Sequence, residues 1–186
     1  MTRKRIATTS LAGCFGCHMS LLDIDERLLE LLQRVDFDRT PLNDYKTFTR
    51  RCDIGLIEGG CCNANNVEVL RAFRAHCDVL VAVGQCAIMG GPPVMRNAIM
   101  HAVDPLRECL ETAYISGPRI SNPGGQIPAD PALPLLLDKV YCCAEVVKID
   151  YQIPGCPPSA DTLYTALLAL LDGREPQFSY AMLRYD

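Results

Sequence analysis

The sequence lacks the features that mark several common classes of protein. It has no long run of lysine or arginine, and its net charge of −4 argues against a nucleic-acid-binding protein. No stretch approaches the ~20 consecutive apolar residues that a membrane-spanning helix requires. We therefore expect neither a nucleic-acid partner nor a membrane partner.

The N-terminal region does not read as an export signal either. A basic start at residues 2–5, followed by Leu11-Ala12-Gly13-Cys14, resembles a bacterial lipoprotein signal. The segment between them is short and half polar, whereas a signal sequence needs about 7–15 apolar residues there. We expect a cytoplasmic protein.

Cysteine, in contrast, is abundant, since the 186 residues include 11. An odd number in a chain of this length is a poor basis for a disulfide framework. Small secreted domains need disulfides because their cores are small, whereas 49% of this sequence is hydrophobic and can fill a core. We therefore expect reduced thiols, of which some are buried and some bind metal.

The pattern of apolar residues predicts strands that alternate with helices. We expect strands at residues 5–12, 52–58, 78–83 and 144–149. We expect helices at residues 18–35, 65–76 (capped by Asn65 or Asn66), 94–112 (interrupted near Asp104-Pro105) and 159–171 (capped by Ser159), and a short helical turn at 135–140. Residues 36–51 and 116–134 read as loops. Such alternation is typical of a doubly wound parallel sheet in an α/β protein.

Four cysteines follow the ends of predicted strands. Cys14 and Cys17 follow the first strand, Cys86 follows the strand at 78–83, and Cys156 follows the last strand. Because ligands bind outside the carboxyl ends of parallel strands, these thiols should converge at one edge of the sheet. Four thiolates that converge from three loops form the ligand set of a 4Fe–4S cluster.

A zinc site is the main chemical alternative for these thiols. A structural zinc site with four cysteines usually has two C-x-x-C pairs about 15–20 residues apart. Only one such pair is present here, Cys14 and Cys17, and the other two cysteines are solitary. Nearby glycines also favour a cluster pocket, because they let backbone N–H groups approach the sulfurs. They are Gly13, Gly16, Gly84 and Gly155.

Four separated segments resemble, in order and spacing, the motifs of nickel–iron hydrogenase small subunits. The segments are Cys14-Phe15-Gly16-Cys17, Glu58-Gly59, Gly84-Gln85-Cys86-Ala87 and Gly155-Cys156-Pro157-Pro158. The first one, continued to Asp23, looks most like the small subunits of cytoplasmic NAD-reducing (bidirectional) hydrogenases. The resemblance spans residue 5 to about residue 171.

The resemblance implies a flavodoxin-like fold, with helices on both faces of a doubly wound parallel sheet. It implies that Cys14, Cys17, Cys86 and Cys156 bind one 4Fe–4S cluster next to a nickel–iron centre on a partner large subunit. The chain would then be the electron-transfer subunit of an NAD-dependent hydrogenase, an oxidoreductase. Its further partners would be the iron–sulfur and flavin subunits of a diaphorase module.

Related families leave alternatives open. The terminal-cluster subunit of respiratory complex I resembles this fold, but its first two ligands are adjacent cysteines. Soluble sulfur-reducing and NADP-linked hydrogenases are further possible relatives. Larger hydrogenase small subunits carry a twin-arginine signal and a C-terminal domain with two more clusters. We expect neither here, and predict one iron–sulfur-binding flavodoxin-like domain over residues 1–186 with a short tail from about residue 174.

Other residues have less certain roles. Glu58 should face the same sheet edge, where it is either a proton relay or cluster-tuning group or an ordinary loop carboxylate. His18 either donates a hydrogen bond to a ligand sulfur or helps to start the helix. FMN is not expected, because Cys14–Cys17 occupy the loop where a flavodoxin holds phosphate. The alternative function would be a flavin-bearing electron-transfer protein.

The other seven cysteines are expected to be small buried apolar residues. They are Cys52, Cys61, Cys62, Cys77, Cys109, Cys142 and Cys143. The loop at 116–134 and the aromatic tail with Phe178, Tyr180 and Tyr185 are candidate docking surfaces, with a solvated loop as the alternative.

Overall fold

The sheet at the centre of the fold has five parallel strands in the order β2-β1-β3-β5-β7. They are β1 Lys4–Ser10, β2 Val35–Phe37, β3 Cys52–Glu58, β5 Cys77–Val83 and β7 Tyr151–Ile153. A computed structural model describes residues 3–99 and 104–183 of the chain. The strand order is that of flavodoxin, so the predicted α/β doubly wound parallel sheet is confirmed.

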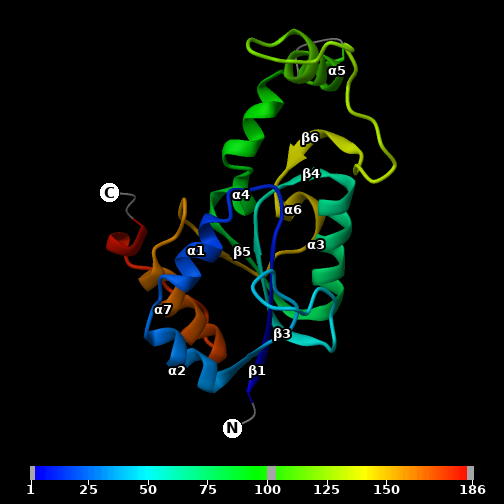
Figure 1. Ribbon diagram of the computed structural model, residues 1–186. Helices are drawn as coiled ribbons and strands as arrows, with labels where there is room; N and C mark the ends of the chain where they lie inside the picture. Colours follow the sequence, from blue (N-terminus) through cyan, green and yellow to red (C-terminus); the bar gives the residue numbers. More distant parts are fainter. Residues whose placement is uncertain (1–2, 100–103, 184–186) are drawn as a thin grey trace.

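Helices cover both faces of the sheet, as predicted (Figure 1). One face carries α1 Gly16–Leu22, α2 Arg27–Arg34 and α7 Ala160–Leu171. The other carries α3 Ala64–His76, α4 Gly84–Met89 and α6 Cys143–Val146. Alternate residues of each strand point to opposite faces. Ile54 and Val81 therefore pack with Leu163 of α7, whereas Ile57 and Leu80 pack with Phe73 of α3.

The helix predicted at 18–35 is two helices, α1 and α2, so this prediction was wrong in detail. The chain turns between them, and Asp25 takes a left-handed backbone conformation with φ of 60° that no α-helix continues through. Val35 leaves the helix and begins β2, which pairs with β1 inside the segment 36–51 predicted as loop. The apolar spacing is helical on both sides of the break, which is why the pattern concealed it.

Two predictions near the C-terminal half were also wrong. The helical turn expected at 135–140 is a strand, β6 Leu136–Tyr141, which pairs antiparallel with β4 Cys61–Asn63. The strand expected at 144–149 contains α6, and the sheet strand is β7, further along the chain. Asp150 fixes where β7 begins, because its carboxylate accepts hydrogen bonds from Leu80 N (2.9 Å) and Arg74 Nη1 (2.6 Å).

The helix ends follow the capping chemistry of the sequence. Asn63, rather than the predicted Asn65 or Asn66, caps α3 by accepting the Asn66 N–H. Ser159 caps α7 as predicted, by accepting the Thr162 N–H. Asp104 caps α5 Pro105–Glu111. Short irregular turns complete the chain: the 3-10 helices η1 Pro92–Ile99 and η3 Tyr180–Leu183, and the π-helix η2 Thr112–Ser116.

The predicted helix at 94–112 is therefore η1 and α5, and its residues 100–103 lie outside the described part of the chain, as does Tyr185 of the tail. Figure 1 shows η1 and α5 extending away from the sheet, with the loop after η2 returning to β6. Among the described residues, no helix has the length and apolar character needed to span a membrane.

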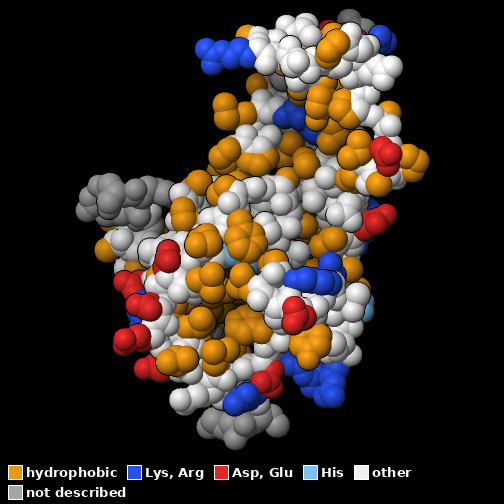
Figure 2. All heavy atoms as spheres, in the orientation of Figure 1, with side chains coloured by type: hydrophobic (Ala, Val, Ile, Leu, Met, Phe, Trp, Pro, Cys, Tyr) orange, Lys and Arg blue, Asp and Glu red, His pale blue; other side chains and the backbone are white. Residues whose placement is uncertain are grey.

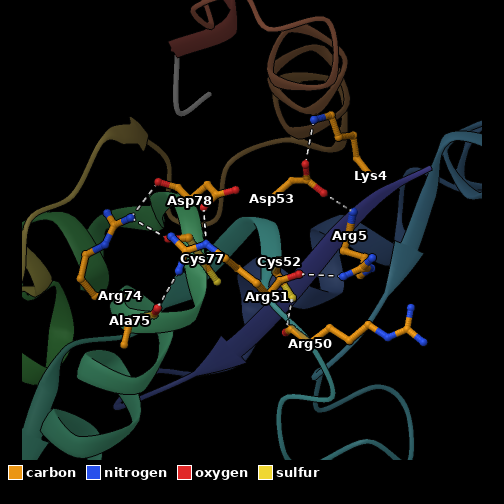
Figure 3. A network of polar contacts seen from close by, with 10 residues as sticks. All are labelled: Lys4, Arg5, Arg50, Arg51, Cys52, Asp53, Arg74, Ala75, Cys77 and Asp78. Carbon is orange, nitrogen blue, oxygen red and sulfur yellow. Dashed lines mark hydrogen bonds and ion pairs between the residues drawn. The ribbon is translucent and has the colours of Figure 1, made fainter. Parts of the chain in front are cut away.

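Salt bridges tie the strands together at the amino-terminal edge of the sheet (Figure 3). The Asp53 carboxylate accepts hydrogen bonds from Lys4 Nζ (2.7 Å) and from the backbone N–H of Arg5 (2.8 Å), joining β1 to β3. Arg51 Nε donates to Asp78 (2.6 Å), joining the start of β3 to β5. These contacts lie at the opposite edge from the loops that follow the strands. Those loops are therefore free to form a site.

Candidate metal centre

The four cysteines predicted as ligands all lie at the carboxyl edge of the sheet. Cys14 and Cys17 flank the turn from β1 into α1, where Phe15 takes a left-handed conformation with φ of 67°. Cys86 lies in α4, directly after β5. Cys156 lies in the loop between β7 and α7. All four are free thiols, and Cys14 and Cys156 are exposed.

The thiols at this edge affect one another's ionisation. Burial raises the pKa of Cys17, and negative charge on Glu58, Cys86 and Cys14 raises it further. Burial also raises the pKa of Cys86, with added contributions from Cys156 and Cys14. Negative charge on neighbouring thiols thus disfavours ionisation of Cys17 and Cys86, a cost that a bound cation would remove.

Glycines leave the space in which the sulfurs lie. A Cβ atom on Gly84 would overlap the Cys17 sulfur, and one on Gly91 would come within 2.6 Å of the Cys86 sulfur. A Cβ on Gly16 would lie 3.1 Å from the Cys14 sulfur. Gly84 also has a φ of 79°, a backbone conformation that residues with a Cβ atom rarely adopt. The sulfur-only donor set and this glycine cradle fit an iron–sulfur cluster.

The spacing of the thiols also bears on the kind of metal group. Within residues 3–99 and 104–183, no group of three or more His, Cys, Asp or Glu side chains surrounds a point closely enough to hold one metal ion. A single zinc ion needs all its sulfurs at about 2.3 Å. A four-iron cluster takes one thiolate on each iron, so its ligands are spaced more widely.

Glu58 is buried at the end of β3 and is held by groups from two other elements, β1 and α1. Its carboxylate accepts hydrogen bonds from Ser10 Oγ (2.6 Å) and from the backbone N–H of His18 (3.0 Å). Burial alone would raise the pKa of Glu58, but hydrogen bonds from His18 and Ser10 outweigh it and leave the pKa below its ordinary value. The carboxylate therefore anchors the start of α1, one residue from Cys17.

His18 links this carboxylate to a chain of hydroxyl groups. Its Nε2 lies 2.9 Å from Thr8 Oγ1, which in turn lies 2.7 Å from Thr40 Oγ1. Its Nδ1 lies 3.3 Å from Glu58 Oε2 but is not aligned for a hydrogen bond. A cavity of about 20 Å³ beside these groups, lined also by Cys17, has room for about one water molecule.

The sequence predictions for these two residues have different outcomes. Glu58 faces the predicted edge, and the backbone of His18, rather than its ring, contributes to the helix start. The His18 ring is directed at Thr8 and Glu58 and not at a ligand sulfur. Ser10, Thr8 and Gly91 were not predicted as site residues, because single hydroxyls carry no pattern and Gly91 lies five residues after Cys86.

Four of the remaining seven cysteines are buried and the other three are partly exposed. Cys52 and Cys77 are direct neighbours on β3 and β5, and both are buried. The other buried ones are Cys61 and Cys143, and the partly exposed ones are Cys62, Cys109 and Cys142. The packing role predicted for all seven thus suits the four buried ones.

Comparison with known proteins indicates the family. Residues 14–170 match the family described as NADH ubiquinone oxidoreductase, 20 Kd subunit. The chain is 45% identical to the NAD-reducing hydrogenase HoxS subunit delta of Cupriavidus necator, over 98% of this chain and 85% of that relative. It is 36% identical to a subunit of the F420-non-reducing hydrogenase of Methanothermobacter thermautotrophicus, over 92% of this chain but 54% of that relative.

A solved structure supports the same assignment. The chain matches a chain of the NAD+-reducing NiFe hydrogenase, crystallised in the H2-reduced state, with a TM-score of 0.91 and 55% identity, and both chains are covered completely. The predicted resemblance to hydrogenase small subunits is confirmed. The chain belongs to the family of the NADH ubiquinone oxidoreductase 20 Kd subunit, and within it to the small subunits of NAD-reducing nickel–iron hydrogenases.

Proposed function

We propose that this chain is the electron-transfer small subunit of an NAD-reducing hydrogenase and holds one 4Fe–4S cluster on Cys14, Cys17, Cys86 and Cys156. The observation that carries the proposal is the set of four free thiols at one sheet edge, in a glycine cradle. The relatives named as NAD-reducing hydrogenases support it. When bound, the cluster accepts and releases single electrons between a nickel–iron centre on the large subunit and a diaphorase module.

The chain's own residues orient the proposed ligands. Glu58 fixes the first turn of α1 through the His18 N–H, and so fixes the direction of Cys17. Ser10 holds the other carboxylate oxygen. We propose Glu58 as a positioning residue that tunes the cluster through Cys17, with proton relay through the adjacent cavity as the alternative role.

An apolar surface next to the centre is the proposed contact with the large subunit. Met19 and Leu22 of α1, Met89 of α4 and Met95 of η1 are all exposed. Figure 2 shows hydrophobic side chains gathered along the segment from α4 to α5 and across the middle of this face. Exposed apolar side chains in such numbers mark protein contacts. The loop at 116–134 and the tail remain proposed further docking surfaces, in a cytoplasmic assembly.

Metal analysis and electron paramagnetic resonance of the purified complex test this function. We expect four iron and four sulfide per small subunit and a signal of a reduced cluster, alongside nickel from the large subunit. Cys86→Ser should abolish or alter the signal, whereas Cys109→Ser, a control thiol on α5, should leave it unchanged. Zinc without iron or sulfide would refute the relay and support a structural zinc site.

Two further outcomes distinguish the remaining alternatives. Co-purification with a membrane-bound quinone-reducing assembly, without nickel, would favour the complex I-like alternative over the hydrogenase. Flavin released from the isolated small subunit would contradict the expected absence of FMN, because Cys14–Cys17 occupy the loop that would bind its phosphate.

A further inference from the structure

A second cavity lies between the end of β1 and the segment that follows β2. Its volume is about 190 Å³, and it is lined by residues 8–10 of β1 and by Arg39, Thr40, Pro41 and Lys46. The lining contains two cationic side chains and no carboxylate, although the chain as a whole has a net charge of −4. The cavity is therefore a positively charged hollow in an acidic protein.

The Arg39 guanidinium differs from those of the other partly buried arginines. In residues 3–99 and 104–183, each of the others donates to a carboxylate or to a backbone carbonyl; they are Arg5, Arg27, Arg74 and Arg96. The Arg39 guanidinium makes no hydrogen bond or ion pair within the same residues. Asp38, its neighbour in sequence, instead accepts the backbone N–H of Thr49 at 3.1 Å. Burial lowers the pKa of Arg39, and no carboxylate offsets that effect.

Two phenyl rings hold this guanidinium by its flat face. Arg39 Cζ lies 5.2 Å from the centroid of the Phe48 ring and 5.0 Å from that of Phe73. Stacking of this kind uses the face of the guanidinium plane and leaves the N–H groups at its edge available. Those N–H groups form a planar fork that matches two oxygens of a phosphate or carboxylate. Arg39 is thus a held donor fork whose acceptor is not supplied by the described residues.

Lys46 brings a second positive charge to the cavity. Its Nζ donates to the carbonyl oxygens of Asn43, Pro41 (3.3 Å) and Thr40 (3.5 Å). These contacts fold the exposed side chain back over its own loop. Among the described residues, no carboxylate lies within ion-pair distance of Nζ, so the contacts position the charge but do not neutralise it.

The backbone of β1 supplies a further donor at this cavity. Backbone groups of alternate strand residues point to the same neighbouring strand. Ile6 and Thr8 bond the β2 side, since Ile6 O accepts from Asp38 N and Thr8 N donates to Arg39 O, both at 2.9 Å. The ladder ends there, because Thr40 N donates to Tyr45 O instead. The N–H of Ser10, next in the alternation, therefore lies on the side of the cavity and beyond the end of the ladder.

We propose that this cavity binds a single phosphate group, with the Arg39 fork and the Lys46 ammonium as its cationic contacts. A phosphate group carries about −1.5 to −2 charges at pH 7, which matches two unneutralised cations, whereas one carboxylate would neutralise only one. Sites for drug-sized molecules have volumes of about 300–1,000 Å³, so this cavity holds the phosphate group and not a whole nucleotide. None of these groups is a proposed cluster ligand, so the site does not depend on the cluster.

Equilibrium dialysis of the purified complex against radiolabelled inorganic phosphate, in excess potassium chloride, tests the site. Other subunits can bind phosphate too, so the quantity compared is the difference between wild type and variants. We expect Lys46→Met to weaken binding at one site per complex by about tenfold or more, because a charge-assisted contact is lost. Arg39→Lys, which keeps the charge but loses the fork, should weaken it by a similar factor. Arg71→Gln removes an exposed charge on α3 and should leave binding unchanged.

Competition identifies the form in which the phosphate group arrives. Displacement of the label by glycerol 3-phosphate would support a small phosphate ester as the ligand, and failure of that displacement would support the free ion. Equal displacement by acetate would overturn the assignment to phosphate, and equal displacement by AMP would contradict the size of the site. Lys46 is exposed, so Lys46→Met keeps the test valid if Arg39→Lys folds poorly. Identical phosphate binding by the wild type and Lys46→Met, or none by the wild type, would overturn the proposal.

Discussion

Replacing Gly84 by alanine tests how the metal centre is built. Gly84 is buried between β5 and Cys86, with a φ of 79° that costs an alanine about 1–2 kcal/mol. The new methyl would also overlap the Cys17 sulfur. The sulfur must move for the methyl to fit, so Gly84→Ala should displace one proposed ligand as well as strain the backbone.

Gly173→Ala is the matched control for the strain alone. Gly173 has a similar φ of 69°, but no atom lies within 4 Å of its would-be Cβ. Strain of 1–2 kcal/mol should lower the Tm of a chain of this size by about 2–8 °C. We expect that decrease for Gly173→Ala, with iron and sulfide unchanged. Gly84→Ala should show a larger decrease and lose at least half of the iron and sulfide.

The comparison of the two variants has a clear refuting result. Iron, sulfide and the paramagnetic signal are measured per complex, and Tm is measured by differential scanning calorimetry. If Gly84→Ala retained its full complement of iron and sulfide and the wild-type signal, and differed in Tm no more than Gly173→Ala, the Cys17 sulfur would not lie against Gly84. The proposed cradle would then be wrong.

Two further predictions concern carboxylates that accept hydrogen bonds within the fold. Burial raises the pKa of Asp150, but hydrogen bonds from Arg74 and the backbone outweigh this effect and lower the pKa. The Asp150 carboxylate therefore stabilises the fold above about pH 4, and this stabilisation is lost as pH falls through the pKa of the folded state. Asp150→Asn should lower the free energy of unfolding by about 1–3 kcal/mol at pH 7. In urea unfolding, this difference from the wild type should shrink below pH 4. A difference that stayed constant with pH would contradict the prediction. Glu58→Gln should lower the free energy of unfolding by a similar ~1–3 kcal/mol, because one of the donors Ser10 and His18 would face an amide N–H₂ group. It should also shift the reduction potential of the proposed cluster in a redox titration. An unchanged potential would remove the positioning role.

The sequence predicted those parts of the fold that depend on buried apolar strands. The strand at 52–58 matches β3 at both ends, and the strand at 78–83 differs from β5 by one residue. Both lie in the middle of the sheet, where burial on two faces produces a long apolar run. Cys86, which follows the second of these strands, could therefore be assigned to the carboxyl edge of the sheet from the sequence alone.

The missed elements are short or half exposed, so their sequences carry little pattern. Only three residues of β7 pair with β5, and their position depends on Asp150, which is distant from Leu80 in sequence. Most of β6 is exposed or partly exposed, and its partner β4 is a three-residue strand. The Glu58–His18 contact likewise joins residues from separate strands and helices, and no local spacing predicts it.

The distribution of the four thiols along the chain sets an order of events during folding. Cys14 and Cys17 lie near the start and Cys156 near the end, so no local segment carries a complete ligand set. Contacts between residues so far apart form late, because closing long loops costs entropy before it yields contacts. Cys156, the last of the proposed ligands, reaches the edge only when β7 has paired with β5. Loading of the proposed cluster should therefore follow the folding of nearly the whole chain, and a chain truncated before β7 would carry only three of the four proposed ligands.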